Sequence, residues 1–416
     1  MGSEWREVVF SEAIKINPKR KLERGKEYPY IDMKSVEPYT RKISNISTKE
    51  YKGSGSRFIK GDTLFARITP SLENGKTAYV RELNKNEVGF GSTEFIVLSN
   101  KEEVTDNKYV YYLSRHTEIR DYAIKSMTGT SGRQRVDRTC FDIIKIRIPP
   151  IHEQQKIASI LSAFDDKIEL NNEMNKTLEE IAQVVFKHWF VDFEFPNENG
   201  EPYKSSGGEF EDSELGPIPK GWKVSKIKDT CQNDSVITGK TPSTKIEDNY
   251  GDYMMFITIP DIHGNMFIID TRKKLSLKGV NSQKNKILPP LSICVSCIAT
   301  PGLVCLTSKP SQTNQQINSI VCKDGISPYY IYFLMKDYKA HIINLGSAGT
   351  ATLNLNKSDF EKIDIIVPNK DVIKKYEDKV RDLFNRILLN QKENVTLSQL
   401  RDTLLPKLIS GEIRVV

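Results

Sequence analysis

Two long stretches of the chain repeat apolar residues in a heptad pattern, from Glu153 to about Phe190 and from about Asp371 to Pro406. Apolar positions that recur every three and four residues over many turns predict a helix with one apolar seam, which needs a partner. We expect the two helices to pair with each other, antiparallel, within one chain. The apolar seam residues include Ile157, Leu161, Phe164, Ile168, Leu178 and Val185, then Tyr376, Val380, Leu383, Ile387, Leu397 and Leu404.

Asparagines interrupt both seams at matching places. The segments "IELNNEMNKTL" and "ILLNQKENVTL" put Asn171 and Asn175 in the first seam, and Asn390 and Asn394 in the second. A polar residue in a helix seam costs stability unless it is paired, and a paired one fixes the register of the two helices. We interpret the four asparagines in this way. The alternative is that they lie on the exposed flank of ordinary helices.

The two helices close two similar halves of the chain. Each half begins with a tryptophan, Trp5 or Trp222, and continues through mixed strand and loop patterns. Each then has a Gly-Thr, a polar loop, a phenylalanine and an alternating strand that ends in proline, at 129–149 and 349–368. So long a period indicates a duplicated domain rather than a solenoid. The segment between the halves is rich in Pro, Gly, Ser and acidic residues, which is typical of a linker or an exposed loop.

The predicted fold class is therefore α+β, with two α/β domains separated by two long, antiparallel, coiled-coil-like helices in an internal pseudo-two-fold repeat. The predicted parts are a first domain at 1–150, the first helix at 151–195, a linker at 196–219, a second domain at 220–368, and the second helix with a C-terminal tail at 369–416.

Composition adds limits on compartment and partners. The 416 residues carry 61 basic and 54 acidic side chains, a net charge of +7 that permits a nucleic-acid partner without requiring one. Of the six cysteines only Cys294 and Cys297 form a C-x-x-C pair, in the apolar segment "LSICVSCIA", and we expect buried free thiols. With no apolar signal segment or membrane span, an intracellular, cytoplasmic protein is expected.

Catalytic motifs fail on inspection. Two Gly-Lys-Thr triplets lack the earlier glycine of a phosphate-binding loop, because Pro70 and Asp234 stand there. The five histidines are isolated, and no dinucleotide or methyl-donor fingerprint occurs. We expect neither catalytic residues nor a metal site in this chain.

Polar and basic loop residues gather in equivalent segments of the two halves, where arginine and lysine suit phosphate or guanine and amides suit adenine. Ordinary solvated turns are the alternative. The candidates are Arg67, Thr69, Asn74, Lys76, Ser92, Thr93, Glu94, Arg133, Gln134, Arg135 and Arg138 in the first half, and Thr238, Lys240, Thr241, Thr300, Gln312, Thr313, Asn314, Gln315, Asn354 and Lys357 in the second.

Several motifs together resemble the specificity subunit of type I restriction-modification systems. They are "IPPIHEQQKIASIL" at the start of the first helix, "HWFVDFEFP" and "LGPIPKGW" between the halves, and "LRDTLLPKLISGEIRV" at the end. The polar loops are similar to target-recognition domains of that family. The start of the second helix, "VPNKDVIKKYEDKV", departs from the family's Pro-Pro-x-x-Glu-Gln form, so that boundary rests on the repeat and on periodicity.

The resemblance implies a non-catalytic subunit whose two target-recognition domains each read half of a bipartite site in double-stranded DNA. It implies that the helices set the spacing and bind two methyltransferase (modification) subunits, that restriction subunits join, and that S-adenosylmethionine, ATP and Mg²⁺ belong to these partners. Because the two domains differ in their loops, we expect different half-sites. Alternatives are a single-chain restriction or modification enzyme and a helical adaptor without a DNA role.

We predict a helix-pair or partner interface along the two seams. Trp189 is included because the aromatic run "FKHWFVDFEF" is either a partner patch or packing against the neighbouring domain. The interface residues are Ile157, Phe164, Asn171, Asn175, Leu178, Trp189, Leu383, Asn390, Asn394 and Leu397.

Overall fold

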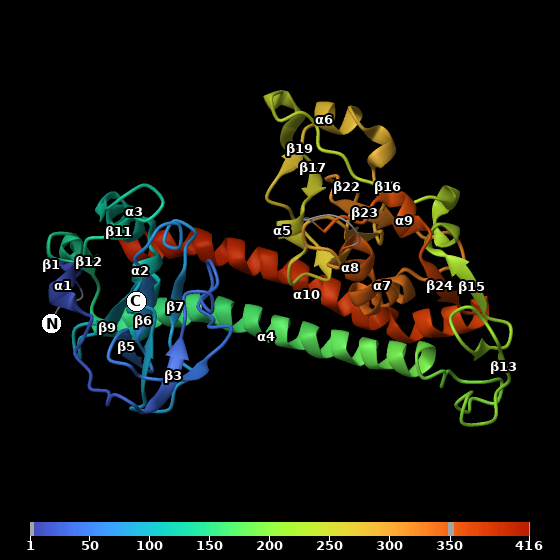
Figure 1. Ribbon diagram of the computed structural model, residues 1–416. Coiled ribbons are helices and arrows are strands. Elements are labelled where there is room, and N and C mark those ends of the chain that lie inside the picture. Colours follow the sequence, from blue (N-terminus) through green and yellow to red (C-terminus); the bar gives the residue numbers. More distant parts are fainter. Residues whose placement is uncertain (1–3, 348–352, 416) are drawn as a thin grey trace. The chain divides into compact units, whose positions relative to one another are not determined.

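The structure is a computed structural model that describes residues 4–347 and 353–415. The chain divides into two compact units: unit 1 comprises residues 1–169 and 396–416, and unit 2 comprises residues 170–395. Each unit combines helices with β-sheets, as the predicted fold class requires (Figure 1). None of the helices in the described part of the chain is both long and apolar enough to span a membrane.

The two predicted long helices are present as α4 (Ile151–Phe190) and α10 (Lys370–Ser410), and each belongs partly to both units (Figure 1). The predicted end of the second helix at Pro406 is wrong, because α10 continues to Ser410. A proline inside a helix removes one backbone hydrogen bond. Burial of Leu405, Leu408 and Ile409 in the core of unit 1 offsets that loss and extends the helix.

Unit 1 is built on two four-stranded sheets, in the orders β2-β9-β6-β7 and β4-β3-β8-β5. Strand β6, "TLFA", is buried along its whole length, as expected of a central strand covered on both faces. The strands of the two sheets are β2 (Ile14–Ile16), β3 (Glu27–Ile31), β4 (Ser47–Glu50), β5 (Ser56–Ile59), β6 (Thr63–Ala66), β7 (Thr77–Tyr79), β8 (Val88–Gly91) and β9 (Phe95–Asn100).

Short helices and two-stranded pairs complete unit 1. Asp106 caps helix α2 by accepting a hydrogen bond from Tyr109 N, and the tyrosines of α2 are buried in the core. The helices are α1 (Phe10–Ala13), α2 (Asn107–Arg115) and α3 (Thr117–Lys125), with a 3₁₀ helix at Arg138–Asp142; the paired strands are β1 (Arg6–Val9) with β12 (Lys145–Ile148) and β10 (Met127–Thr128) with β11 (Arg135–Val136).

Unit 2 contains a five-stranded sheet, β16-β23-β20-β21-β18, and a three-stranded sheet, β19-β17-β22. The C-x-x-C segment begins as the predicted strand β20, and Cys294 and Cys297 are buried free thiols. The strands are β16 (Ile237–Thr238), β17 (Tyr250–Ile257), β18 (Phe267–Ile268), β19 (Lys274–Leu275), β20 (Ile293–Ser296), β21 (Val304–Thr307), β22 (Ser311–Thr313) and β23 (Ile317–Ile320).

The helices of unit 2 are short apart from its share of α4 and α10. Helix α7 is buried along most of its length, and Tyr329, Tyr332 and Phe333 pack against Phe384 of α10. The helices are α5 (Ile259–Ile262), α6 (Leu277–Asn281), α7 (Pro328–Asp337), α8 (Lys339–Ser347) and α9 (Lys357–Glu361), with 3₁₀ helices at Ile227–Thr230, Gln232–Asp234, Glu247–Asn249 and Lys284–Lys286.

The duplication predicted from the sequence is visible in the strand pairing. In unit 1, β1 pairs antiparallel with β12, the last strand before α4. In unit 2, β15 (Lys223–Lys226) pairs in the same way with β24 (Asp364–Val367), the last strand before α10. In each unit, therefore, the strand after the tryptophan closes against the strand before the long helix. Gly349 and Thr350, which begin the second closing segment, lie outside the described residues.

The two long helices are antiparallel within each unit. In unit 1, Arg401 of α10 pairs with Asp165 of α4 at 2.5 Å, and Arg414 beyond α10 pairs with Glu153 at 2.7 Å. In unit 2, Asn171 pairs with Asn394 and Asn175 with Asn390. Residue numbers rise on one helix as they fall on the other, which is the predicted direction.

The segment between the halves folds against unit 2. Tyr203 stacks on Phe195, Phe195 stacks on Trp222, and Phe210 contacts Phe193. A short hairpin joins β13 (Phe210–Glu211) to β14 (Ile218–Pro219). Five aromatic side chains in and beside a Gly- and Pro-rich segment thus order it despite a composition typical of linkers.

Candidate nucleic-acid interface

Three of the predicted polar segments of unit 1 meet at one place. Residues 67–69 leave strand β6, residues 92–94 precede β9, and residues 134–136 form β11 and its approach. Backbone hydrogen bonds join them: Arg67 N donates to Glu94 O (2.9 Å), Thr69 N donates to Gln134 O (3.0 Å), and Val136 N donates to Arg67 O (2.8 Å). We call these three segments site 1.

A carboxylate and an arginine occupy the exposed side of site 1. Arg135 Nε lies 3.0 Å from both carboxylate oxygens of Glu94, and Arg135 Nη2 lies 2.7 Å from Oε1. The hydrogen bond that Arg135 donates to Glu94, and the negative charge of Glu94, raise the pKa of Arg135 above the usual value. Ser92 Oγ accepts a hydrogen bond from Glu94 N (3.2 Å) and thereby fixes the turn that carries the carboxylate.

The same pattern of three backbone hydrogen bonds occurs in unit 2. Cys297 N donates to Gln316 O (2.8 Å), Ala299 N to Leu353 O (3.0 Å), and Leu355 N to Cys297 O (2.9 Å). Asn314 Oδ1 accepts from Gln316 N at 3.2 Å, as Ser92 does in unit 1. We call residues 297–299, 314–316 and 353–355 site 2.

The two sites have the same backbone but different side chains. An isolated β-bridge pairs Ile68 with Arg135 in site 1 and Ile298 with Asn354 in site 2. Arg135 therefore corresponds to Asn354, and Glu94 corresponds to Gln316. Both Arg135 and Asn354 are exposed. Site 1 has a charged pair, Arg135 and Glu94, where site 2 has two amide side chains. Charged and amide side chains pair with different base edges in DNA.

The remaining candidates of unit 1 lie around site 1 and differ in their exposure to solvent. Arg133, Arg138, Asn74 and Thr93 are exposed. Lys76 is half-buried, and its ammonium donates to Met33 O at 2.8 Å. Thr69 is buried and its hydroxyl accepts from Gln134 N (3.0 Å), so Thr69 supports the loop from within.

In unit 2, the segment 238–241 approaches site 2. Lys240 N donates to Thr313 O (3.0 Å), and a Cβ atom at Gly239 would lie 2.1 Å from Asn314 O, so only glycine fits there. Lys240, Gln315 and Thr300 are exposed, and Thr241 Oγ1 donates to Gln315. Thr238 and Lys357 are farther along: Thr238 Oγ1 bonds Asn318, and Lys357 Nζ bonds Ser235 Oγ (2.8 Å).

Gln312 and Thr313 are in the interior, in strand β22. The Gln312 amide accepts from Gln283 Nε2 (2.8 Å) and donates to Gln283 O (3.0 Å). These two side chains cannot reach a DNA surface without breaking the sheet edge, so we correct the prediction by leaving them out of the candidate interface. All three positions of β22 are buried, and the polar sequence "QTNQQ" gives no indication of that burial.

The predicted seam residues lie along the helix pair. Within unit 2, Asn171 and Asn390 are buried, and Asn171 Nδ2 donates to Asn394 Oδ1 (2.9 Å) while Asn390 Nδ2 donates to Asn175 Oδ1 (2.8 Å). The repeat that relates the two halves converts one of these pairs into the other. Ile157 is fully buried in unit 1, whereas Phe164, Leu178, Leu383 and Leu397 are half-buried.

Trp189 belongs to the core of unit 2. It lies 6.0 Å from Tyr376 of α10 and 6.3 Å from Phe190, measured between ring centroids. Phe186 and Phe190 pack on Tyr330 in the same core. The aromatic run is therefore packing between helices, which is the simpler of the two interpretations of that segment.

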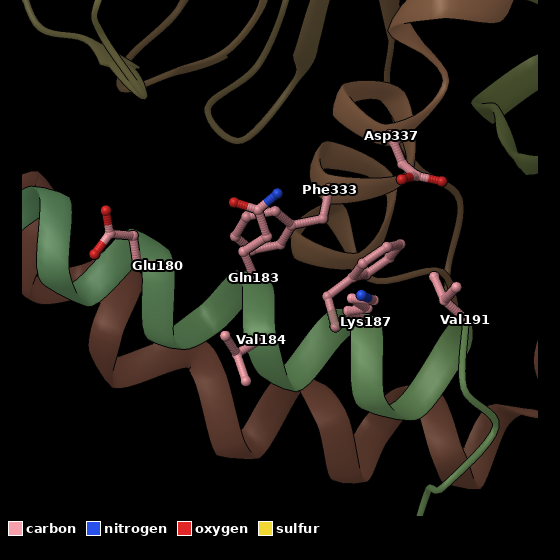
Figure 2. Close-up of a pocket in the computed structure, with 8 residues that line it drawn as sticks. Glu180, Gln183, Val184, Lys187, Val191, Phe333 and Asp337 are labelled. Atoms are coloured by element: carbon pink, nitrogen blue, oxygen red, sulfur yellow. The ribbon is translucent and has the colours of Figure 1, made fainter.

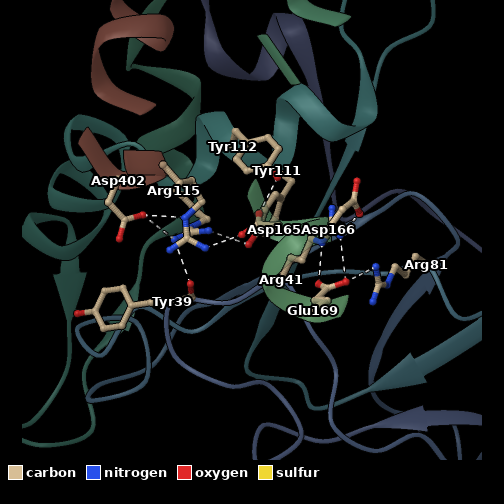
Figure 3. Close-up of polar contacts among 11 residues, drawn as sticks. Tyr39, Arg41, Arg81, Tyr111, Tyr112, Arg115, Asp165, Asp166, Glu169 and Asp402 are labelled. Atoms are coloured by element: carbon tan, nitrogen blue, oxygen red, sulfur yellow. Dashed lines mark hydrogen bonds and ion pairs between the residues drawn. The ribbon is translucent and has the colours of Figure 1, made fainter. Parts of the chain in front are cut away.

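A cluster of ion pairs that no sequence pattern indicates holds the first domain on α4 (Figure 3). Arg41, almost fully buried, donates from Nε to Glu169 at 2.8 Å and also bonds Asp166. Arg81 Nη1 lies 2.6 Å from the same Glu169 carboxylate. Arg41 and Arg81 come from irregular loops without any periodic pattern, so only the structure brings them to the helix.

A pocket of about 270 Å³ lies between α4 and α7 in unit 2 (Figure 2). Val184 of α4, Val191 just after α4 and Phe333 of α7 form its apolar part, and Glu180, Lys187 and Asp337 stand at its edge. Val184 is 67% exposed and Ile181 is 46% exposed, so this face of α4 carries apolar side chains in contact with solvent. Across the described residues, no group of three His, Cys, Asp or Glu side chains could hold a metal ion.

Comparison with known proteins gives concordant matches along the chain. A family model described as the type I restriction modification DNA specificity domain matches residues 3–180 and 219–399. The chain is 37% identical to the specificity subunit of the type I restriction enzyme HindI of Haemophilus influenzae, over 89% of this chain and 90% of that protein. It is 28% identical to the MjaIX specificity subunit of Methanocaldococcus jannaschii, over 94% of this chain and 88% of that protein.

Among solved structures, the S subunit of a type I restriction-modification system from M. genitalium is similar with a TM-score of 0.55. The alignment spans 98% of this chain and 96% of that one at 15% identity. At that identity the likeness supports the fold alone.

Proposed function

The chain belongs to the family of type I restriction-modification specificity subunits, and from that membership we propose that it reads a bipartite, asymmetric site in double-stranded DNA, one half with site 1 and the other with site 2. It is the DNA-specificity subunit of such a system and not its catalytic subunit. The observation that carries the proposal is the shared backbone of the two sites with different exposed side chains. Two sites with the same backbone arrangement and different exposed side chains suit two half-sites of different sequence.

The long helices are proposed to set the distance between the half-sites. Helices α4 and α10 each continue without interruption from one unit into the other. A continuous α-helix has a fixed rise per residue and is stiff over this length, so its residue count is a measure of distance. The paired asparagines support a single register for that measure.

Two methyltransferase subunits are the proposed partners, with restriction subunits joining them, and S-adenosylmethionine, ATP and Mg²⁺ are assigned to those subunits. The exposed face of α4 around Ile181, Val184 and Val191 supports a protein contact, since apolar side chains gathered beside a pocket are typical of interaction surfaces. Replacing Val184 by lysine is then expected to weaken assembly with the methyltransferase.

The proposal is tested with the complex of the full chain and its methyltransferase subunits. Mapping methylated bases in the genome that encodes the protein gives the bipartite sequence. We expect that sequence to bind about a thousandfold or more tighter than a scrambled duplex, with an affinity that falls steeply with salt. Replacing Arg133 and Arg135 by alanine should remove dependence on one half-site only, and replacing Thr300 and Asn354 should affect only the other.

Arg147 provides the matched control, because it is an exposed arginine of unit 1 in strand β12, outside site 1. Its alanine variant should keep both half-site preferences. Equal binding of the mapped and the scrambled duplex by the unmodified complex would contradict the proposed function.

A further inference from the structure

Arg135 is held in a conformation that leaves one particular edge of its guanidinium free. Its Nε and Nη2 both bond the Glu94 carboxylate, so the side edge of the group is occupied. The remaining contact, from Nη1 to Arg133 O, is 3.5 Å and therefore at the outer limit of a hydrogen bond. The end edge, formed by Nη1 and Nη2, stays available, and 45% of the side chain is exposed.

The Glu94 side chain is itself well fixed. Only 22% of it is exposed, its backbone N is held by Ser92, and its backbone O receives the hydrogen bond from Arg67 N. Arg135 is also anchored by its backbone, through the bridge to Ile68. An arginine fixed at its Cα and at its side edge loses little conformational freedom when its end edge binds a ligand.

Guanine is the base whose edge matches this geometry. In the major groove its O6 and N7 atoms are two adjacent acceptors, and the two-donor end edge of arginine pairs with them bidentately. Phosphate would also accept an arginine, but it needs no such fixed orientation, and exposed Arg133 and Arg138 nearby suit it equally. Holding the Arg135 guanidinium with Glu94 favours only a ligand that must approach from one direction.

We propose that Arg135 reads one guanine of the half-site bound by site 1, with Glu94 as its positioning residue, and that Asn354 contacts the corresponding base pair of the other half-site. This inference rests on the proposed function. The equivalence of the two positions supports the second part, because Asn354 occupies the same β-bridge and its exposed amide suits adenine.

The test uses the full complex and the mapped bipartite duplex, with 7-deazaguanine replacing one guanine at a time in each half-site. This analogue lacks the N7 acceptor and keeps Watson–Crick pairing. With the unmodified complex, one guanine of a single half-site should be sensitive, its replacement weakening binding about tenfold or more. With Arg135→Ala, the same replacement should change binding less than twofold.

Two further variants sharpen the result. Glu94→Gln should reduce the 7-deaza effect at that guanine and leave the effects at other guanines unchanged, which a merely structural role would not do. Arg135→Asn should shift the preferred base at that position from guanine toward adenine, as at Asn354. The control Arg147→Ala should retain the full effect.

The inference is overturned if the half-site contains no guanine, or if the unmodified complex and Arg135→Ala lose the same factor at every guanine. In either case the complex still prefers its bipartite duplex, so the proposed function stands. Failure of the unmodified complex to prefer that duplex is the separate outcome that contradicts the proposed function.

Discussion

At the scale of single residues, unit 1 contains a buried ion pair between the two long helices. Arg401 and Asp165 are 5% and 4% exposed, and the Asp165 carboxylate also accepts a hydrogen bond from Tyr112 (2.6 Å). Figure 3 shows how Asp165 lies among the tyrosines of α2 and the neighbouring arginines. Taking both charges out of water is unfavourable. Their mutual contact, the hydrogen bond from Tyr112 and a second ion pair of Arg401, with Asp402 (2.9 Å), compensate.

Replacing Arg401 by methionine should therefore destabilise unit 1 by about 3–5 kcal/mol, because a buried carboxylate loses its counter-charge. The free energy of unfolding from urea titration measures the effect. The double variant Asp165→Leu with Arg401→Met should recover part of the loss, since it removes the unpaired charge but leaves the Tyr112 hydroxyl without its acceptor. A single variant as stable as the parent would mean that the pair does not contribute.

His116 couples the stability of unit 1 to pH. It joins helices α2 and α3, and its Nδ1 lies 4.0 Å from Glu118. Burial lowers the pKa of His116 below its ordinary value, although Glu118 and Asp121 oppose the shift. The unfolded chain then binds this proton more readily than the folded chain, so stability is lost as pH falls below about 6.5.

We expect the unfolding midpoint of the protein to fall more between pH 7.5 and pH 5.5 than that of the variant His116→Gln, which has no titrating group there. Urea titrations at the two pH values give the comparison. Equal losses in the two proteins would show that His116 does not titrate in this range.

At the scale of elements, the asparagine pairs of α4 and α10 convert a sequence pattern into a defined register. Asn390→Leu should cost about 1–3 kcal/mol in unit 2, because Asn175 Oδ1 loses the donor 2.8 Å away. The double variant Asn175→Leu with Asn390→Leu should be at least as stable as the parent, at the expense of a unique register. Thermal unfolding gives both values, and a single variant without any loss would contradict the pairing.

The same elements show how far sequence alone reaches. Heptad periodicity predicts α4 and α10 because it extends over many turns, and the duplicated closing strands predict β12 and β24. The prediction that α10 ends at Pro406 is wrong. The burial of Leu408 and Ile409 in the core outweighs the tendency of proline to end a helix. The meeting of residues 67–69, 92–94 and 134–136 depends on backbone bonds between distant segments, which no local pattern encodes.

At the scale of the whole molecule, the proposed spacing function predicts a change in DNA preference when the helices are shortened together. Deleting residues 171–177 of α4 and 388–394 of α10 removes one heptad from each helix along with both asparagine pairs. The loss is about 10 Å, so the preferred spacer should shorten by about three base pairs.

Binding assays on duplexes with graded spacers measure this change. The deletion in α4 alone should impair assembly, because the seam residues on the two helices then no longer meet. A paired deletion that assembles and keeps the original spacer preference would show that the helices do not set it.

The discontinuity of unit 1 has a consequence for biosynthesis. Its core includes Leu405, Leu408 and Ile409, and its ion pairs include Arg401 and Arg414, all of which follow unit 2 along the chain. Unit 2 is a single stretch, residues 170–395, and is synthesised between the two parts of unit 1. Unit 1 therefore begins to be synthesised before unit 2 and can be completed only after it.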